Sequence, residues 1–317
     1  MAHELTIRAN GFTEMAFVGA TPWHKLGQQL DQEATFDQWR TAAGMDWTIE
    51  QTPAQFTAPN GELQTVPERF VQYRSDTLAP LSVVSTRYKP VQPAEVLEFF
   101  SDLVENSGFR LHTAGTLFGG KRLWALAETG KFAEVSKGDG IGGFLLLSTS
   151  CDKTLATTAR FTTVRVVCNN TLGMATSNGA DCVSFTHATK FDADLMKAKL
   201  GAAVESFGAF MEMSKFLQRQ RLQETQAKTF LARILDVPYT EDNTPQETRP
   251  FKRIMDLFNG EAKGTEVAGG TKWGLLNAVT EYYDHHRPSR TGDARLNSAW
   301  FGKGDTIKSR AVAVLTA

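Results

Sequence analysis

Apolar residues follow two different periods along the chain. Between Phe70 and Phe185 they alternate with polar residues in short runs, which is typical of strands, and one helical segment interrupts them. Beyond Asp192 they recur every three or four residues, which is typical of amphipathic helices. Because strands come first and helices afterwards, the pattern predicts an α+β fold. We expect an antiparallel, hairpin-rich sheet with a long amphipathic helix, followed by a helical C-terminal region.

Pairs of turn residues predict the hairpins of this sheet. Asn60-Gly61 separates residues 56–58 from residues 63–66, and both turn positions accept a positive φ at little cost. Gly119-Gly120 separates the alternating run 109–117 from its returning partner, 121–127. The further strands that the pattern predicts cover residues 144–148 and 161–168.

The helices are predicted from capping residues and breakers as well as from period. Pro93 at a first helical position and Gly108 at the end bound an amphipathic helix. The long helix is expected over 192–222, with Asp192 or Asp194 as its cap. Shorter helices are expected at 35–40, 226–236, 246–258, 271–285 and 306–316. The chain should therefore comprise a mostly β core domain with N-terminal loops and short helices, 1–190, and a helical region, 191–317.

Composition places the chain among folded globular proteins. Of its 317 residues, 41% are apolar and 22% are charged. No apolar run approaches the roughly 18 residues of a membrane-spanning helix, and the first residues do not resemble a secretory signal. The three cysteines are odd in number and never spaced as CxxC, which favours a reducing compartment. We therefore expect a cytoplasmic protein without a membrane partner.

The net charge of −1 is unevenly distributed. Residues 1–67 hold 3 basic and 8 acidic side chains, whereas residues 285–317 hold 6 and 2. The protein is not a polycation, so indiscriminate nucleic-acid binding is excluded, although a localised basic face is not. The basic C-terminal stretch is consistent with a nucleic-acid arm, or with a solvated face that pairs with the acidic first residues of its own or a neighbouring chain.

Several common types of catalytic site are absent. The chain has no P-loop, no nucleophile elbow and no zinc-binding His-Glu-x-x-His helix. Gly138, Gly140 and Gly142 lead into an apolar run rather than a helix, so they indicate a turn and not a dinucleotide site. His285-His286 is expected at a helix end, where a cationic imidazole is favoured. We predict no catalytic residue, metal or cofactor.

Cations on the predicted sheet are the strongest candidates for a functional surface. Lys153 lies in a turn before the strand that carries Arg160 and Arg165, and this strand is rich in threonine. Guanidinium groups bind phosphate through paired hydrogen bonds, and threonine hydroxyls add donors. The alternative is that both arginines pair with carboxylates of neighbouring strands.

Three short motifs interleave aromatic residues with cations, as in proteins that stack bases on rings and match phosphates to Lys and Arg. Long cationic side chains lying beside half-buried rings would give the same sequence pattern. The residues of these motifs that we assign to nucleic-acid binding are Arg74, Arg87, Tyr88, Lys89, Lys121, Arg122 and Trp124.

Five blocks of sequence resemble one family. They cover residues 1–5, 16–27, 162–172, 273–282 and 295–302. These blocks resemble the uncharacterised phage/plasmid-like family also called domain of unknown function 932. The resemblance implies an origin in a mobile element and a bacterial cytoplasm, and it implies no reaction. A hairpin-rich sheet followed by a long helix is also similar in architecture to phage single-strand annealing proteins, without a shared motif.

Three hypotheses of function follow. The first is a non-enzymatic, oligomeric protein that binds or anneals single-stranded DNA in phage or plasmid recombination or replication. The second is a phage-encoded protein-interaction module, such as an inhibitor of a host protein or an assembly factor. The third is a nuclease or hydrolase that uses carboxylates such as Asp152 or Asp181, and no ligand spacing in the sequence supports it.

Overall fold

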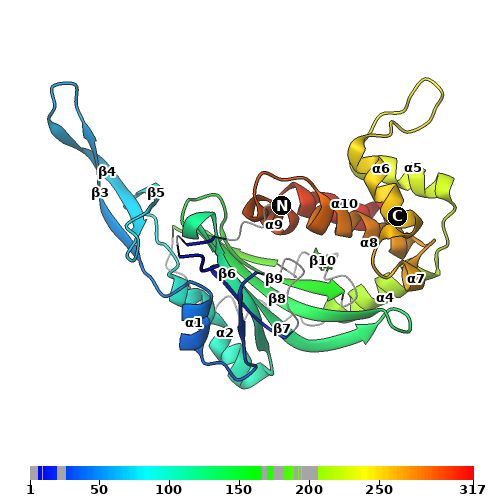
Figure 1. Cartoon of the computed structure of the whole chain (residues 1–317), viewed down its shortest axis with the longest axis horizontal. Coiled ribbons are helices and arrows are strands. Elements are labelled where there is room, and N and C mark those ends of the chain that lie inside the picture. Colours follow the sequence, from blue (N-terminus) through cyan, green and yellow to red (C-terminus); the bar gives the residue numbers. More distant parts are fainter. Residues whose placement is uncertain are drawn as a thin grey trace.

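The computed structural model describes residues 6–8, 10–19, 26–165, 170–173, 182–188, 192, 194 and 206–317. Their fold is α+β, as the sequence predicts, with one large sheet, one small sheet and helices around the large sheet (Figure 1). The strands are β1 (Met15–Val18), β2 (Gln28–Leu30), β3 (Ile49–Thr57), β4 (Leu63–Arg74), β5 (Pro80–Ser85), β6 (Arg110–Leu117), β7 (Arg122–Glu134), β8 (Gly140–Ser150), β9 (Thr157–Arg165), β10 (Asn170–Gly173) and β11 (Cys182–Phe185).

The helices fall into an early pair and a late group. The early pair is α1 (Phe36–Ala42) and α2 (Pro93–Ser107), and a short turn of 3-10 helix, η1 (Phe118–Gly120), joins β6 to β7. The late group is α4 (Ser206–Arg219), α5 (Glu224–Leu235), α6 (Arg249–Asp256), η3 (Leu257–Glu261), α7 (Thr265–Ala268), α8 (Lys272–Glu281), η4 (Tyr282–His286), α9 (Gly292–Phe301) and α10 (Lys303–Thr316).

The large sheet has the order β10-β9-β8-β7-β6-β1-β2, and β11 also pairs with β9. Its pairs are antiparallel except β1 with β2, which run parallel. The hairpin predicted at Gly119-Gly120 is therefore confirmed as β6–β7. Gly120 has φ +93°, and a Cβ there would lie 2.7 Å from the Trp47 ring, so only glycine fits this turn.

The large sheet is buried on both faces at β7. This burial explains why the first half of β7 is an almost continuous apolar run in the sequence. Leu123, Ala125 and Ala127 face the main core with α1 and α2. Trp124 and Leu126 face a second apolar cluster. That second cluster is covered by Leu296, Trp300 and Phe301 of α9.

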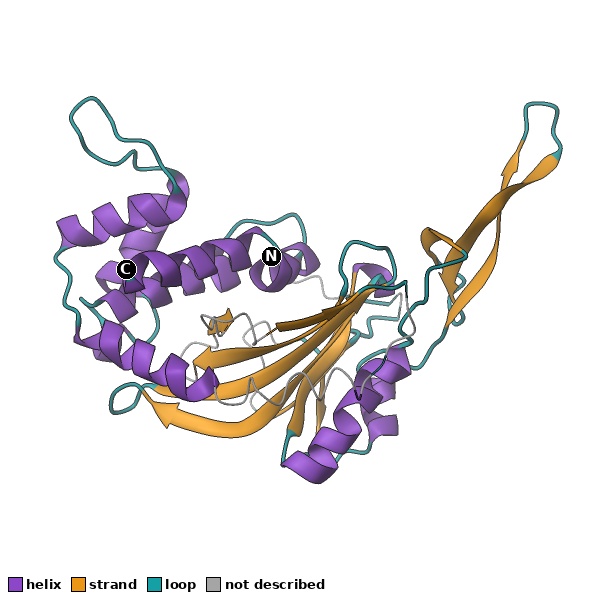
Figure 2. Cartoon of the chain, turned by 180° about the vertical axis from the view of Figure 1, so that it is seen from behind, coloured by secondary structure: helices purple, strands orange, loops and turns teal. Residues whose placement is uncertain are grey.

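The small sheet, β3-β4-β5, forms an arm that projects from the body (Figures 1 and 2). Its hairpin turns at Asn60-Gly61, as predicted, and β5 pairs only with the half of β4 nearer the body. Beyond that point the arm is a two-stranded ribbon on which Phe56 and Leu63 are 52% and 64% exposed.

Most of the predicted helices are confirmed, with boundaries shifted by a few residues. Thr35 caps α1 through a reciprocal capping box with Gln38, as expected for a threonine before a helical run. Of the predicted long helix, α4 accounts for residues 206–219, while 195–205 lie outside the described residues. Helices α7 and α9 and strands β1, β2, β5, β10 and β11 were not predicted as individual elements.

The helices after Ser206 share one core with the sheet. Buried residues of α4, α8 and α10 belong to the same apolar cluster as those of β7, β8 and β9. The Trp273 indole N–H of α8 also donates to Asp139 Oδ2 at 2.8 Å. The domain boundary expected near residue 190 falls among residues that the structure does not describe. The described residues on its two sides contribute to one apolar core.

Candidate functional site: cations where the arm meets the sheet

Several predicted cations converge on the turn of residues 151–155, which follows β8. Arg122 at the start of β7 donates through Nη2 to Thr154 Oγ1 at 2.8 Å. Lys153 donates through Nζ to the Val83 carbonyl of β5 at 2.8 Å. The backbone N–H of Cys151 donates to the Lys121 carbonyl at 2.9 Å and holds the turn against β7. The turn therefore joins the large sheet to the base of the arm.

Tyr88 anchors a second cationic segment at the same place. Its phenol donates to the Ser150 carbonyl at 2.6 Å, and its ring stacks on His187 with centroids 4.7 Å apart. The carbonyl of His187 accepts from the Lys89 backbone N–H at 2.8 Å. Burial raises the pKa of the Tyr88 phenol, and the nearby Cys151 and Asp152 raise it further. Arg87 and Lys89 flank this buried tyrosine and are themselves exposed.

We call Arg87, Lys89, Lys121, Arg122 and Lys153, together with Phe118, the junction cluster. Lys153 is exposed and Lys121 is half-buried. Burial lowers the pKa of Arg122, and the charge of Asp152 opposes that shift. Phe118 was not predicted as a functional residue, because a phenylalanine before Gly-Gly is unremarkable in sequence. Its ring is 36% exposed, its φ is +56°, and the Arg122 guanidinium lies 5.9 Å from its centroid.

Arg74 has a structural role rather than the predicted contact with phosphate. Its guanidinium donates to Glu14 at 2.7 and 3.0 Å and to Asp76 at 2.8 and 2.9 Å, and it lies 4.2 Å from the centroid of the Trp47 ring. Burial opposes its charge, but the hydrogen bonds to Asp76 and Glu14 outweigh burial and raise the pKa of Arg74. Because the side chain is only 3% exposed, it does not reach a ligand.

Arg160 is also used within the fold. Arg160 donates to both carboxylate oxygens of Asp305 at 2.9 Å and to the Trp300 carbonyl at 2.8 Å. This geometry ties β9 to α9 and α10. Arg160 therefore pairs with a carboxylate, as in the alternative, but the carboxylate lies on a helix and not on a neighbouring strand. The side chain of Arg165 lies outside the described residues.

Trp124 and Tyr88 do not present rings on which bases could stack. Trp124 is 1% exposed and lies edge-on to Trp300, with centroids 4.9 Å apart. Tyr88 is buried, as described above. Trp124 lies on a strand that is buried on both faces. The alternation of residues in the sequence does not show whether the second face of a strand is covered, so the motif identified a core aromatic residue and not an exposed one.

The basic C-terminal stretch forms packed helices and not an extended arm. Lys308 and Asp284 make a buried ion pair at 2.7 Å. Arg295 donates to the His285 carbonyl, and Arg310 to the Ile234 carbonyl. Of these cations, Lys308 joins α10 to η4, Arg295 joins α9 to η4, and Arg310 joins α10 to α5.

The described residues offer little for metal or nucleophilic chemistry. They contain no group of three or more His, Cys, Asp or Glu side chains that could hold a metal ion. Asp152 accepts from the Thr154 backbone N–H and hydroxyl, as a turn residue does, while Asp181 lies outside the described residues. Burial raises the pKa of the Cys151 thiol to about 12, and the Asp152 charge adds to this. Cys151 is therefore a neutral core residue.

No helix of the described part of the chain is both long and apolar enough to cross a bilayer. No curated protein and no solved structure matches the chain. Residues 80–300, which include β5 to β11 and the helices from α4 to α9, match the family described as domain of unknown function (DUF932). This match covers well over half of the 317 residues and includes the junction cluster. The chain belongs to the DUF932 family.

Proposed function

We propose that the protein is a non-enzymatic single-stranded DNA-binding or annealing protein of phage or plasmid recombination or replication. It would act as an oligomer in the bacterial cytoplasm. The observation that carries this proposal is the junction cluster, in which cations from three separate segments meet at the turn of residues 151–155, and the Arg122 guanidinium lies 5.9 Å from the centroid of the partly exposed Phe118 ring. Cations beside an exposed aromatic ring suit a strand whose phosphates and bases alternate.

The roles differ from those expected from sequence alone. Lys89, Lys121 and Lys153 would contact phosphates, because they are exposed or half-buried and lie in the segments that meet at the turn of residues 151–155. Phe118 would stack a base in place of Trp124, and such stacking contributes about 1–3 kcal/mol per base. Arg122 lies beneath Phe118 and would hold the ring in position.

Fluorescence anisotropy with a labelled oligonucleotide tests the proposal. The full chain should bind at low salt, and affinity should fall as salt rises, because binding releases counterions from the strand. In the double variant Lys121→Gln/Lys153→Gln, the slope of log affinity against log salt should decrease by about 1.4, since each phosphate contact on a single strand contributes about 0.7. Phe118→Ala should weaken binding roughly 5- to 150-fold with an unchanged slope.

The matched control is Lys303→Gln, which removes an exposed cation at the start of α10, outside the junction cluster. It should leave both affinity and slope unchanged. Absence of binding at low salt by the folded protein refutes the proposal. An effect of Lys303→Gln equal to that of one junction lysine would show that only net charge matters.

The projecting arm favours a second candidate, a protein-interaction module whose partner is another copy of the chain. Both edges of the two-stranded ribbon carry backbone groups without strand partners in the described structure, and Phe56 and Leu63 are exposed on it. Replacing residues 56–64 with a two-residue turn should then reduce the mass measured by light scattering. A mass equal to that of the unmodified protein would remove this role for the arm.

A further inference from the structure

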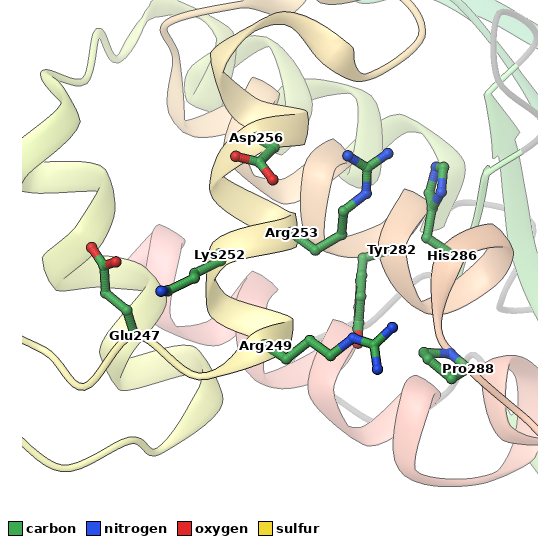
Figure 3. Close-up of a pocket in the computed structure, with 8 residues that line it drawn as sticks. All are labelled: Glu247, Arg249, Lys252, Arg253, Asp256, Tyr282, His286 and Pro288. Carbon is green, nitrogen blue, oxygen red and sulfur yellow. The ribbon is translucent and has the colours of Figure 1, made fainter.

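A second basic surface lies among the helices at the end of the molecule opposite the arm. It is a cavity of about 530 Å³ between α6 and the segment that begins at η4 (Figure 3). Its size falls within the range of small-molecule sites. The lining residues are Glu247, Arg249, Lys252, Arg253, Asp256, Tyr282, His286 and Pro288.

One face of α6 supplies the first wall. Arg249, Lys252, Arg253 and Asp256 are spaced i, i+3, i+4 and i+7, so their side chains leave the helix on the same side. The opposite face of α6 is apolar and is buried through Phe251, Ile254 and Met255. Burial of that face fixes the rotation of the helix and directs the three cations to the cavity.

The second wall is made by η4 and the residues that follow it. Tyr282 and His286 come from this π-helical turn, and Figure 3 shows the phenol of Tyr282 beside the Arg249 guanidinium. Burial raises the pKa of the phenol, against the charges of Arg287 and Arg249, so it remains a neutral hydrogen-bond donor. Helix α6 also runs into a π-helical turn, η3, and such turns are frequent at functional sites.

The charges of the cavity are not all satisfied within it. Glu247 pairs with Lys228 at 3.5 Å, Arg253 with Glu261, and His286 with Glu281 at 3.4 Å. Within the part of the chain that the structure describes, neither Arg249 nor Lys252 has a side-chain hydrogen bond or ion pair. These two cations and the phenol therefore form a set of donors with an excess of positive charge.

We propose that this cavity binds a phosphate monoester group, carried either by a free nucleotide or by the 5′ end of a nucleic-acid strand. A monoester carries close to two negative charges at neutral pH and three strong acceptor oxygens. Arg249 can bind two of these oxygens in parallel, and Lys252 can bind as a mobile point charge. Arg253 lies on the same face of α6 as these two cations, and His286 lies on the opposite wall, at the end of η4 (Figure 3).

This site is distinct from the junction cluster, because α6 and the base of the arm lie at opposite ends of the molecule (Figure 1). The inference therefore does not depend on the proposed strand-binding role. The protein could bind a strand at the junction cluster without binding phosphate at α6, or bind phosphate without binding a strand.

Isothermal titration calorimetry of the full chain with inorganic phosphate and with dAMP tests the proposal. Both should bind at low ionic strength, and the double variant Arg249→Gln/Lys252→Gln should weaken binding by at least about tenfold, the loss expected for charge-assisted hydrogen bonds. Both side chains are exposed, so the variant should melt at the same temperature as the parent protein. Lys252→Arg keeps the charge and should retain most of the affinity.

Two comparisons complete the test. The junction variant Lys121→Gln/Lys153→Gln should bind phosphate like the parent protein, which separates this site from strand binding. If a 5′-phosphorylated oligonucleotide binds at least tenfold more tightly than its 5′-hydroxyl counterpart, the strand end is the source of the phosphate; equal binding of the two with retained dAMP binding assigns a free nucleotide. No heat with phosphate or dAMP, or equal affinity in the Arg249→Gln/Lys252→Gln variant, overturns the proposal.

Discussion

Replacing Arg74 with alanine should lower the free energy of unfolding by about 4 kcal/mol. The substitution leaves the carboxylate of Glu14 in the interior, where its side chain is 0% exposed. Removing one partner of a buried ion pair costs about 3–5 kcal/mol, because the remaining charge loses its counter-ion without regaining water.

The contacts that Glu14 keeps in the Arg74→Ala variant place the electrostatic part of the loss toward the lower end of this range. Glu14 keeps the Arg8 guanidinium at 2.7 Å and also accepts from the Thr116 hydroxyl. The electrostatic part should therefore be about 3 kcal/mol. Loss of the guanidinium from the face of Trp47, at 4.2 Å, adds about 1 kcal/mol. The sum is a large share of the roughly 5–15 kcal/mol that stabilises a typical domain.

Urea unfolding monitored by tryptophan fluorescence measures this loss. The control is Arg40→Ala, whose ion pair with Asp37 is exposed and should contribute less than about 1 kcal/mol. The double variant Glu14→Gln/Arg74→Met removes both charges and should recover part of the stability. A loss below about 1 kcal/mol for Arg74→Ala would show that the pair does not stabilise the fold.

The ion pair of Arg74 with Asp76 predicts a dependence on pH. Burial would raise the pKa of Asp76, but the hydrogen bond and charge of Arg74 lower it below its ordinary value of 3.8. The contribution of Asp76 to stability is therefore complete above the unfolded pKa and is lost as pH falls through the folded value. Unfolding curves below about pH 4 should show this loss in the parent protein and a smaller one in Arg74→Ala.

Three further predictions concern the core and the C-terminal helices. Cys151 should resist alkylation by iodoacetamide at pH 8 in the native protein, because its thiol has a pKa of about 12; mass spectrometry of the Cys151 peptide before and after unfolding measures this, and rapid native labelling would contradict it. Arg160→Gln should cost about 1–3 kcal/mol and increase hydrogen exchange in α10 more than in β9, because the bond to Asp305 is bidentate and about one-fifth exposed. Trp124→Ala should cost about 3–5 kcal/mol in urea unfolding, and a loss below about 1 kcal/mol would contradict its placement in the core.

The architecture could be predicted from the sequence because its signals are local. Asn60-Gly61 and Gly119-Gly120 produce hairpins through backbone geometry at the turn itself, and Pro93 starts a helix for the same reason. Strand β1 escaped prediction because it is only four residues long. Its parallel neighbour, β2, is even shorter, and pairing of β1 with β6 across almost 100 residues leaves no local trace.

The candidate site could be predicted only in part, because partners of charged residues are non-local. Lys121 and Lys153 were named from sequence, and both lie at the turn of residues 151–155 in the structure. Sequence could not show that Arg160 meets Asp305, 145 residues away. It also gave no sign of the cavity at α6, whose walls are brought together by tertiary packing.

Strand β1 covers the edge of β6, and this contact affects whether the region matched by the family can fold as a separate chain. The matched region, 80–300, contains β6 but not β1, so a chain trimmed to that region would present β6 as an open edge. It would also lack Asp305, and Arg160 would lose its carboxylate. An uncovered edge invites pairing with another chain. A chain cut to residues 80–300 should therefore associate through β6, whereas a chain that also keeps β1 and Asp305 should not.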